Sequence, residues 1–462
     1  MRESVLDGRG IDGLRQAVAG DVLVDGDAGY LDAGRVMTAE GRPQVIVRCA
    51  SANDVVAALK YAETNDLPIA VRSGGHHAAG FGTNDGGVVI DVRPMDEVRL
   101  LPDDVVRIGT GATWGRVAER LGKVGLAISS GDTASVGVGG LMAGGGIGWM
   151  VRKHGLAIDN VVSAEVVTAD GSVRRVDAAT DSELFWGLRG AAGSLGVVTS
   201  YDISAVRRPT VHFGTLLYPW TQAEQVLEGW AEYAADAPEE LTSSLQLAPT
   251  MMADRQVPVA IMVCVTGDVD AALEPLRHLG SMITEKVSEV PYADVFSDMS
   301  MPADWRPRIR NGFYNAWSPD LSQRLLEARP RIPGLAIEIR SLGGAYGAMP
   351  ADATAFAHRD ARFLVNSVLM GSPEQQGTQQ PKDFDALWRS MNPNGAYQNF
   401  ISDPTDADLD SCFPEQHRAR LAALKQAVDP GHVFRSPLSV PPRPEWTGGR
   451  RHLMRWAMRS RR

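Results

Sequence analysis

Two adjacent histidines, His76 and His77, follow a glycine pair in the stretch RSGGHH, residues 72–77. Successive glycine N–H groups can form a concave nest that binds an anion such as a phosphate. Side chains of neighbouring residues on an extended loop point apart, and no acidic or thiol residue stands beside the histidines, so no metal site is expected. We therefore predict a phosphate-bearing ligand here, with His76 at the edge of the nest. His77 is expected to face solvent, with donation to a phosphate as the alternative.

Further glycines follow in VGVGG (136–140), GGGIG (144–148) and GAAGSLGVV (190–198). Because glycine has no Cβ, the backbone at such runs can approach a ligand closely. Val197 and Val198 end the third run on a predicted strand and would offer main-chain polar groups. The glycine runs place the ligand in the first half of the chain.

The elements that must position these residues differ between the two halves of the chain. Residues 1–207 read as alternating strands, helices and turns, with Ser51 capping a helix and Asp170-Gly171 forming a two-residue hairpin turn. From Pro209 onward, amphipathic helices and strands are typical of an antiparallel sheet backed by helices. We predict an α+β protein with domains at 1–207 and 208–400, a C-terminal segment at 401–445 that returns to the first domain, and a basic tail at 446–462.

The bulk composition excludes several classes of protein. A net charge of −10 gives no electrostatic reason to expect nucleic acid, and three widely spaced cysteines form neither a disulfide framework nor a zinc pattern. An apolar run of about 18 residues, which a membrane span needs, is missing, as is an N-terminal signal core. We expect a cytoplasmic protein that binds neither a membrane nor a metal.

Four stretches together resemble a known family. They are RSGGH (72–76), SVGVGGLMAGGGIGWMVRKHGLAIDN (135–160), DSELFWGLRGAAGSLGVVTS (181–200) and GAYQNF (395–400). Their order and content resemble the berberine-bridge-enzyme-like FAD-linked oxidases of the vanillyl-alcohol-oxidase superfamily, over residues of about 40 to 440. The resemblance implies a PCMH-type FAD-binding domain, a substrate domain built on the antiparallel sheet, and a bacterial enzyme of the type that binds FAD through a single covalent bond.

The resemblance implies a role for particular positions. His76 matches the histidine that bonds the 8α-carbon of FAD. Thr133 stands where many relatives have a cysteine that makes a second bond, so we expect one covalent link only. Ala78 replaces a pocket tyrosine, which predicts a wider substrate pocket, and Val136 occupies the position that governs oxygen access, which favours an oxidase.

The resemblance also implies a wider set of FAD contacts. They are expected from Arg72, Ser73, Gly74, Gly75, His77, Thr133, Ser135, Val136, Gly137, Gly140, Gly144, Gly145, Gly148, Val197, Val198, Tyr397 and Asn399.

The base for catalysis is expected from the second half of the chain. Tyr397 and Asn399 are two residues apart and would share one face of a strand. Tyr397 is the first choice for activating a substrate hydroxyl, with its pKa lowered by neighbours. Glu338 and Arg340 also share a face, as a catalytic pair or equally as a structural ion pair. Asn366 interrupts an apolar strand and is expected to line the pocket.

We predict an FAD-dependent oxidase that abstracts hydride from a small hydroxylated or amine-bearing molecule, such as a secondary metabolite, or closes a ring oxidatively. Molecular oxygen would accept the electrons and give hydrogen peroxide. Two alternatives stay open: a resistance flavoprotein that sequesters or deactivates a toxic compound, and a carbohydrate oxidase. A homodimer is left open as well.

Overall fold

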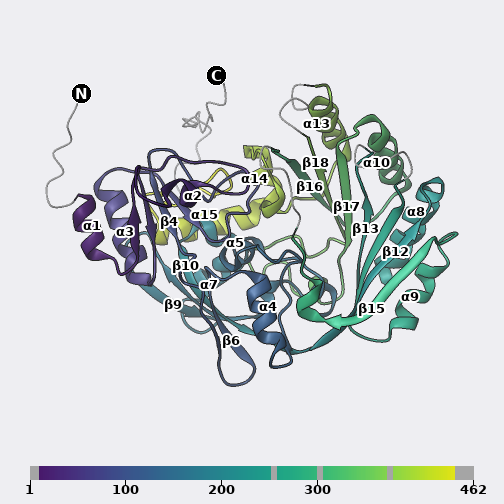
Figure 1. Ribbon diagram of the computed structural model, residues 1–462, viewed down its shortest axis with the longest axis horizontal. Helices are drawn as coiled ribbons and strands as arrows, with labels where there is room; N and C mark the ends of the chain where they lie inside the picture. The colour runs from purple at the N-terminus through teal and green to yellow at the C-terminus, as the bar shows by residue number, and fades with distance from the viewer. Residues whose placement is uncertain (1–9, 251–256, 299–304, 372–377, 443–462) are drawn as a thin grey trace.

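The computed structural model describes residues 10–250, 257–298, 305–371 and 378–442, so the predicted basic tail lies outside the described residues. The chain forms two regions of mixed helix and strand, which lie side by side in Figure 1. One contains three small sheets, of four, five and two strands, built from the first half of the chain, and the other contains a seven-stranded sheet. The α+β prediction is confirmed.

The first sheet has the strand order β1-β2-β4-β3. Its strands are β1 (Asp21–Leu23), β2 (Val45–Arg48), β3 (Ile69–Arg72) and β4 (Val88–Asp91). β2 and β3 both pair with β4 in parallel, because helix α3 (Ala52–Thr64) crosses over between them. Ser51 caps α3 as predicted, since its hydroxyl accepts from the Asp54 N–H at 3.3 Å. The loop that carries His76 leaves the end of β3.

The second sheet is antiparallel, with the order β5-β6-β10-β8-β9. Its strands are β5 (Val98–Leu100), β6 (Val105–Gly109), β8 (Val161–Val167), β9 (Val173–Asp177) and β10 (Val197–Ser204). Helices α4 (Trp114–Gly122), α5 (Val138–Gly144), α6 (Val151–His154) and α7 (Ser182–Ala191) belong to the same region. The β8–β9 hairpin forms, but its loop is longer than predicted, because the Thr168 N–H donates to the Ser172 carbonyl and leaves residues 169–171 beyond that pair.

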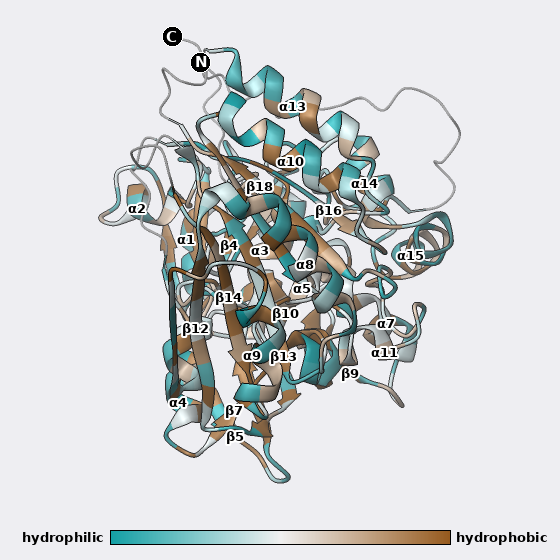
Figure 2. Ribbon diagram, turned by 90° about the vertical axis from the view of Figure 1, so that its right-hand side faces the viewer, coloured by the Kyte–Doolittle hydropathy of each residue, from teal (hydrophilic) through white to brown (hydrophobic). Residues whose placement is uncertain are grey.

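The seven-stranded sheet is antiparallel, in the order β15-β12-β14-β13-β17-β18-β16. Its strands are β12 (Thr210–Tyr218), β13 (Leu241–Leu247), β14 (Val259–Val265), β15 (Thr284–Pro291), β16 (Arg308–Tyr314), β17 (Leu335–Ser341) and β18 (Phe363–Leu369). Helices α8 (Ala223–Asp236), α9 (Val269–Arg277), α10 (Pro319–Arg331) and α13 (Gln380–Met391) cover its outer face (Figures 1 and 2). On β17, Leu335, Ile337 and Ile339 are buried in the core beneath these helices, and the alternate residues face the other region.

The C-terminal segment packs against the first region. Helices α14 (Asp406–Cys412) and α15 (Glu415–Val428) follow the second region in the chain, and α15 contacts α7. Lys425 is fully buried there and donates to the Ser194 carbonyl at 2.5 Å and to the Asp429 carboxylate at 2.5 Å. We propose 1–207, 208–400 and 401–445 as the limits of the two domains and the returning segment.

Buried polar contacts join the two regions. Arg359 donates to both carboxylate oxygens of Asp159 at 2.7 and 2.8 Å, and Trp186 donates to the Asp352 carbonyl at 2.9 Å. Arg152 donates to three carbonyls of the second region, those of Ala234, Leu342 and Ala237. None of the helices that the structure describes has the length and apolar character of a membrane span.

Candidate FAD and substrate site

The loop after β3 presents a run of backbone N–H groups without protein acceptors. Within the described residues, the main-chain N–H groups from Gly74 to His77 donate to no protein atom. Gly75 has φ of +74°, in the left-handed region that glycine adopts without strain. Two hydrogen bonds fix the loop to the rest of the first region. The Met37 N–H donates to the Gly75 carbonyl at 3.0 Å, and the Ser73 hydroxyl donates to the Thr110 carbonyl at 2.6 Å. Such a run fits an anionic group, as the sequence predicts.

His76 lies at the edge of this run, half-buried. Burial lowers the pKa of its imidazole, opposed by Asp298 and by a hydrogen bond with the Ser135 backbone. Asp298 is anchored by Ser135, whose N–H donates to the carboxylate at 2.9 Å and whose hydroxyl donates to the same oxygen. The imidazole is therefore neutral at neutral pH and keeps a lone pair for bonding.

His77 does not face solvent, so that expectation is wrong. Its Nδ1 accepts from the Ala79 N–H at 3.2 Å, and its Nε2 lies 3.1 Å from the Gln398 carbonyl. Phe81 stacks on the ring, with centroids 4.3 Å apart. Burial lowers the pKa of His77 to about 4. Gln398, which belongs to the second region, lies where the sequence predicts solvent.

The loop before α5 and the His76 loop touch through their backbones. A Cβ on Gly74 would lie 2.4 Å from the Gly137 nitrogen, and a Cβ on Gly137 would lie 2.1 Å from the Ser73 hydroxyl oxygen. At Gly140 a Cβ would meet nothing within 4 Å, so this part of α5 faces open space. Glycine is thus required where the loops meet, and the backbone is free where a ligand could approach.

The GGGIG run bends around the aromatic residues of the second region. Gly145 has φ of +136°, and a Cβ there would lie 3.5 Å from the Tyr397 ring. A Cβ on Gly144 would overlap the Asn399 amide, and one on Gly148 would lie 2.5 Å from the Gly131 carbonyl. Gly144 and Gly145 therefore allow the two regions to pack closely, and Gly148 allows close packing within the first region.

Several predicted contact residues have partners within the protein. Arg72 is buried and its guanidinium donates to the Ala33 carbonyl, so it supports the loop from behind. Val197 and Val198 are paired with β8, and the Val198 carbonyl accepts from the Thr110 hydroxyl at 2.7 Å. The pairing with β8 therefore engages part of the main-chain polar groups of these two valines.

The positions that the resemblance singled out stand close to the loop. Ala78 is buried and Val136 is partly buried against the core of the first region. The Val136 carbonyl accepts from the Trp114 N–H at 3.0 Å. Thr133 precedes a turn at Ala134 and Ser135 and donates its hydroxyl to Asp132 at 2.9 Å.

Tyr397 and Asn399 come together, but not on a strand. Gln398–Phe400 form the short 3-10 helix η6, preceded by Tyr397. The Tyr397 hydroxyl accepts from the Gly146 N–H at 3.0 Å and from the Asn399 amide at 3.0 Å. Burial raises the pKa of Tyr397 to about 12, against the lowering predicted, because the hydrophobic surroundings outweigh the two hydrogen bonds. The strand prediction is wrong because a side chain, and not a neighbouring strand, binds the main chain here. The Asn311 amide oxygen accepts from the Tyr397 N–H at 2.6 Å.

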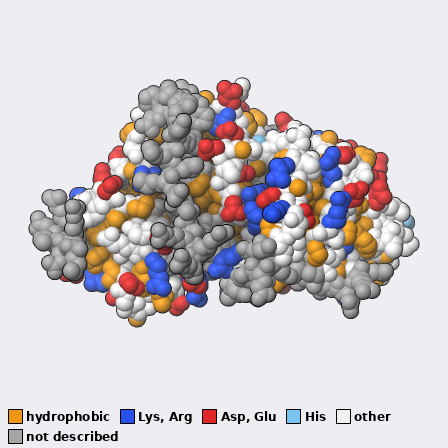
Figure 3. Space-filling view, turned by 90° about the horizontal axis from the view of Figure 1, so that it is seen from above, with side chains coloured by type: hydrophobic (Ala, Val, Ile, Leu, Met, Phe, Trp, Pro, Cys, Tyr) orange, Lys and Arg blue, Asp and Glu red, His pale blue; other side chains and the backbone are white. Residues whose placement is uncertain are grey.

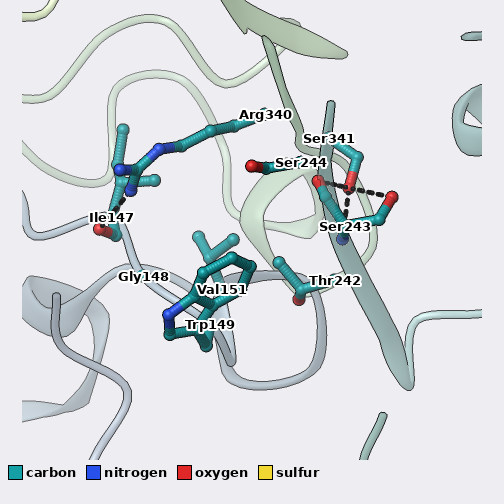
Figure 4. A pocket seen from close by; sticks show the side chains of 9 residues that line it. All are labelled: Ile147, Gly148, Trp149, Val151, Thr242, Ser243, Ser244, Arg340 and Ser341. Carbon is teal, nitrogen blue, oxygen red and sulfur yellow. Dashed lines mark hydrogen bonds between the residues drawn. The ribbon is translucent and has the colours of Figure 1, made fainter. Parts of the chain in front are cut away.

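The inner face of the large sheet presents an ionic cluster. On β17, Arg340 contacts the Glu338 carboxylate at 2.9 Å and reaches across to Asp132 of the first region. Arg340 also donates to the Ile147 carbonyl at 3.4 Å, as Figure 4 shows. Although burial lowers the pKa of Arg340, the two carboxylates raise it further, so the guanidinium stays charged. Two carboxylates facing one guanidinium leave the cluster with one negative charge.

Glu338 belongs to a polar row across four strands. The register places Glu338 opposite Gln246 on one side and Asn366 on the other, and Asn366 opposite Asn311. The Ser244 hydroxyl donates to Glu338 at 3.2 Å. The Asn366 carbonyl oxygen is buried and has no partner among the described residues. An unsatisfied buried polar atom is costly, and this oxygen is free to accept a hydrogen bond from a ligand.

Three residues of this site were missed from the sequence: Asp132, Asp298 and Asn311. Each lies outside the glycine motifs and reaches the site only through tertiary contacts. Asp132 could have been found from the sequence, because it directly precedes Thr133, a position that the resemblance singled out. No group of three histidine, cysteine or carboxylate side chains in the described ranges could hold a metal ion.

Comparisons with known proteins agree with this geometry. The FAD binding domain family matches residues 43–177. (R)-6-hydroxynicotine oxidase of Paenarthrobacter nicotinovorans is 28% identical over 449 residues, which cover 92% of this chain and 97% of the relative. The solved structure of 6-hydroxy-D-nicotine oxidase from Arthrobacter nicotinovorans has a TM-score of 0.81 at 26% identity, over 92% of this chain and 98% of that one. Glucooligosaccharide oxidase from Acremonium strictum, described with a 6-S-cysteinyl, 8α-N1-histidyl FAD, has a TM-score of 0.81 at 21% identity, over 93% and 99% of the two chains.

Proposed function

Because the chain is an FAD-dependent oxidoreductase with the PCMH-type fold of the berberine-bridge-enzyme-like oxidases, we propose that it holds FAD through a single bond to His76. We propose further that it oxidises a small hydroxylated or amine-bearing molecule, such as a secondary metabolite, with oxygen as the electron acceptor and hydrogen peroxide as product. A relative that is named for a hydroxylated amine, 6-hydroxynicotine, supports this substrate class.

One observation carries the proposal: the run of free N–H groups from Gly74 to His77 beside the neutral imidazole of His76. The N–H groups suit the pyrophosphate of FAD, and the imidazole lone pair suits a bond to its 8α-carbon. Bound FAD supplies the hydride acceptor, which no side chain of a protein can replace. Thr133, a hydroxyl in place of a thiol, supports a single covalent bond.

The residues of the sheet would hold the substrate and its proton. Tyr397 keeps its proton at neutral pH, because its pKa is about 12, and its hydroxyl can donate to a substrate oxygen or nitrogen. Glu338 is the better proton acceptor, since its carboxylate lies on the inner face of the sheet between Ser244 and Arg340. Arg340 also contacts Asp132, so its positive charge is divided between two carboxylates and offsets the charge of Glu338 only in part. The unpartnered oxygen of Asn366 would accept from the substrate.

The bond to His76 is tested by acid precipitation of the purified protein, followed by a visible spectrum and intact mass. A yellow pellet with the mass of one FAD added, lost in His76→Ala, is expected. A colourless pellet from the wild-type protein would overturn the covalent bond. Acid-stable flavin that survives in His76→Ala and is lost only when Thr133→Ala is added would contradict the single link.

The substrate class is tested by anaerobic mixing of the flavin-loaded protein with (R)-6-hydroxynicotine and, separately, with xylobiose. We expect bleaching of the flavin by the amine and peroxide formation on admitting air. Bleaching by xylobiose alone would shift the assignment to a carbohydrate oxidase. Glu338→Gln should slow the bleaching about 100-fold, in the range that a positioned base contributes.

A further inference from the structure

We propose that His77 is a positioning residue that fixes the segment carrying Tyr397 and Asn399 to the loop carrying His76. This role rests on the proposed function of the site. It gives the two adjacent histidines separate tasks, one on the cofactor and one on the residues that face the substrate.

The hydrogen bonds of His77 define a single tautomer. The Ala79 N–H can only donate, so Nδ1 of His77 must be the acceptor, at 3.2 Å. The ring proton therefore sits on Nε2 and is donated to the Gln398 carbonyl at 3.1 Å. A protonated ring would set two N–H groups against each other at Ala79, which agrees with a pKa of about 4. The neutral ring is the only form that satisfies both contacts.

The ring is held rigidly on the side of the first region. Phe81 stacks on it at an interplanar angle of 23°. The His77 carbonyl accepts from the Gly80 N–H at 2.9 Å and from the Thr38 hydroxyl at 3.4 Å. A donor that is fixed in this way loses little freedom when it binds its acceptor, so the contact can transmit position between the two loops.

The acceptor belongs to the segment whose neighbours form the site. Gln398 itself also donates its side-chain amide to the Gly190 carbonyl at 2.5 Å. On one side of it, the Tyr397 hydroxyl meets the Gly146 N–H, and on the other the Asn399 amide reaches the Leu141 carbonyl at 3.3 Å. The bond from His77 thus fixes the centre of a three-residue unit that contacts Gly146 at one end and α5 at the other.

Two substitutions separate the two ring nitrogens. An asparagine amide oxygen can occupy the Nδ1 position and accept from the Ala79 N–H as in an Asx-turn, but its nitrogen cannot reach Gln398. A glutamine amide nitrogen can occupy the Nε2 position and keep the donor. His77→Asn should therefore release the segment, and His77→Gln should retain it. His278→Asn, at an exposed histidine that directly follows α9, is the matched control.

The test is hydrogen–deuterium exchange on the full-length, flavin-loaded protein, read in peptides covering residues 395–402. We expect about tenfold faster exchange in His77→Asn, and wild-type exchange in His77→Gln and His278→Asn, with peptides from α15 unchanged in all three. Unchanged exchange in His77→Asn, or faster exchange spread over the whole chain, would overturn the positioning role.

The same samples separate this inference from the proposed function. Acid-stable flavin should be equal in the wild type and in both variants, because His76 is untouched. Absence of acid-stable flavin from the wild-type protein would refute the covalent bond of the proposed function. It would leave the exchange result for His77 unaffected. With a substrate that bleaches the flavin, His77→Asn should lower the bleaching rate at saturation about tenfold and leave the half-saturating concentration nearly unchanged. A change confined to the half-saturating concentration would contradict a positioning role.

Discussion

The two sides of the site are built by different means. On the first side, from Ser73 to Gly148, main-chain groups and the absence of Cβ atoms shape the surface. On the sheet side, side chains from β13, β16, β17 and β18 do so, and each strand contributes one polar residue to the row. A cofactor with fixed shape suits the first kind of surface, whereas a substrate that differs between related enzymes suits the second, because side chains can change without moving the backbone.

One face of the exterior gives no such contrast. On the face shown in Figure 3, basic and acidic side chains lie next to one another and are not gathered by sign.

The first prediction concerns Gly74, on the first side of the site. In Gly74→Ala the new Cβ would lie 2.4 Å from the Gly137 nitrogen, which is main chain and cannot move aside alone. We expect the purified protein to carry less than about a tenth of the wild-type flavin and to lose about 3 kcal/mol of unfolding free energy. The measurements are the ratio of visible to ultraviolet absorbance and denaturant unfolding. Gly122→Ala, outside the glycine runs and with a Cβ that would lie 3.9 Å from the Ala293 side chain, is the control; equal flavin in both variants would show that close backbone approach is not needed.

A second prediction concerns the contact between the two sides. Arg359→Met leaves the Asp159 carboxylate buried without its partner, and their side chains are only 1% and 7% exposed. We expect a loss of about 3–5 kcal/mol in unfolding free energy, measured by urea denaturation. Removal of both charges, in Arg359→Met with Asp159→Asn, should recover part of the loss. A loss no greater than that of an exposed pair, such as Arg331→Met beside Glu327, would mean that the two sides are not joined through this pair.

A third prediction sharpens the role of the tyrosine. Tyr397→Phe removes the acceptor of the Gly146 N–H, which should cost about 1–3 kcal/mol. The phenol pKa is raised from 10.0 to about 12 in the folded protein, so its contribution is present below pH 10 and is lost as the pH rises toward 12. The difference in unfolding free energy between wild type and variant should therefore narrow across that range. A difference that widens with pH would place the phenol pKa below its ordinary value.

The smallest effect is expected on the sheet side. Asn366→Leu replaces a buried carbonyl oxygen that has no partner among the described residues. Because no hydrogen bond to that oxygen is lost, the unfolding free energy should stay within about 1 kcal/mol of wild type or rise slightly. Thermal melting measures it. A loss above 2 kcal/mol would show that Asn366 stabilises the fold and is not kept for a ligand.

The same contrast explains what the sequence could predict. The glycine loops and His76 are contiguous motifs, so their residues could be named from the sequence, and the α+β architecture follows from the change of pattern near Pro209. The cluster of Asp132, Glu338 and Arg340 joins positions about 200 residues apart and depends on strand register. The raised pKa of Tyr397 and the contacts of His77 depend on which side chains bury them, and no local pattern encodes that.

The returning C-terminal segment sets an order on biosynthesis. Lys425 and Asp429 fill the inside of the first region, where the ammonium also donates to the Phe434 carbonyl at 2.8 Å. The ribosome has to translate past residue 434 before the Lys425 ammonium can bind both the Ser194 and the Phe434 carbonyls. The nucleotide-binding half, although encoded first, is therefore completed last, and premature termination anywhere in the second half would leave it unfinished.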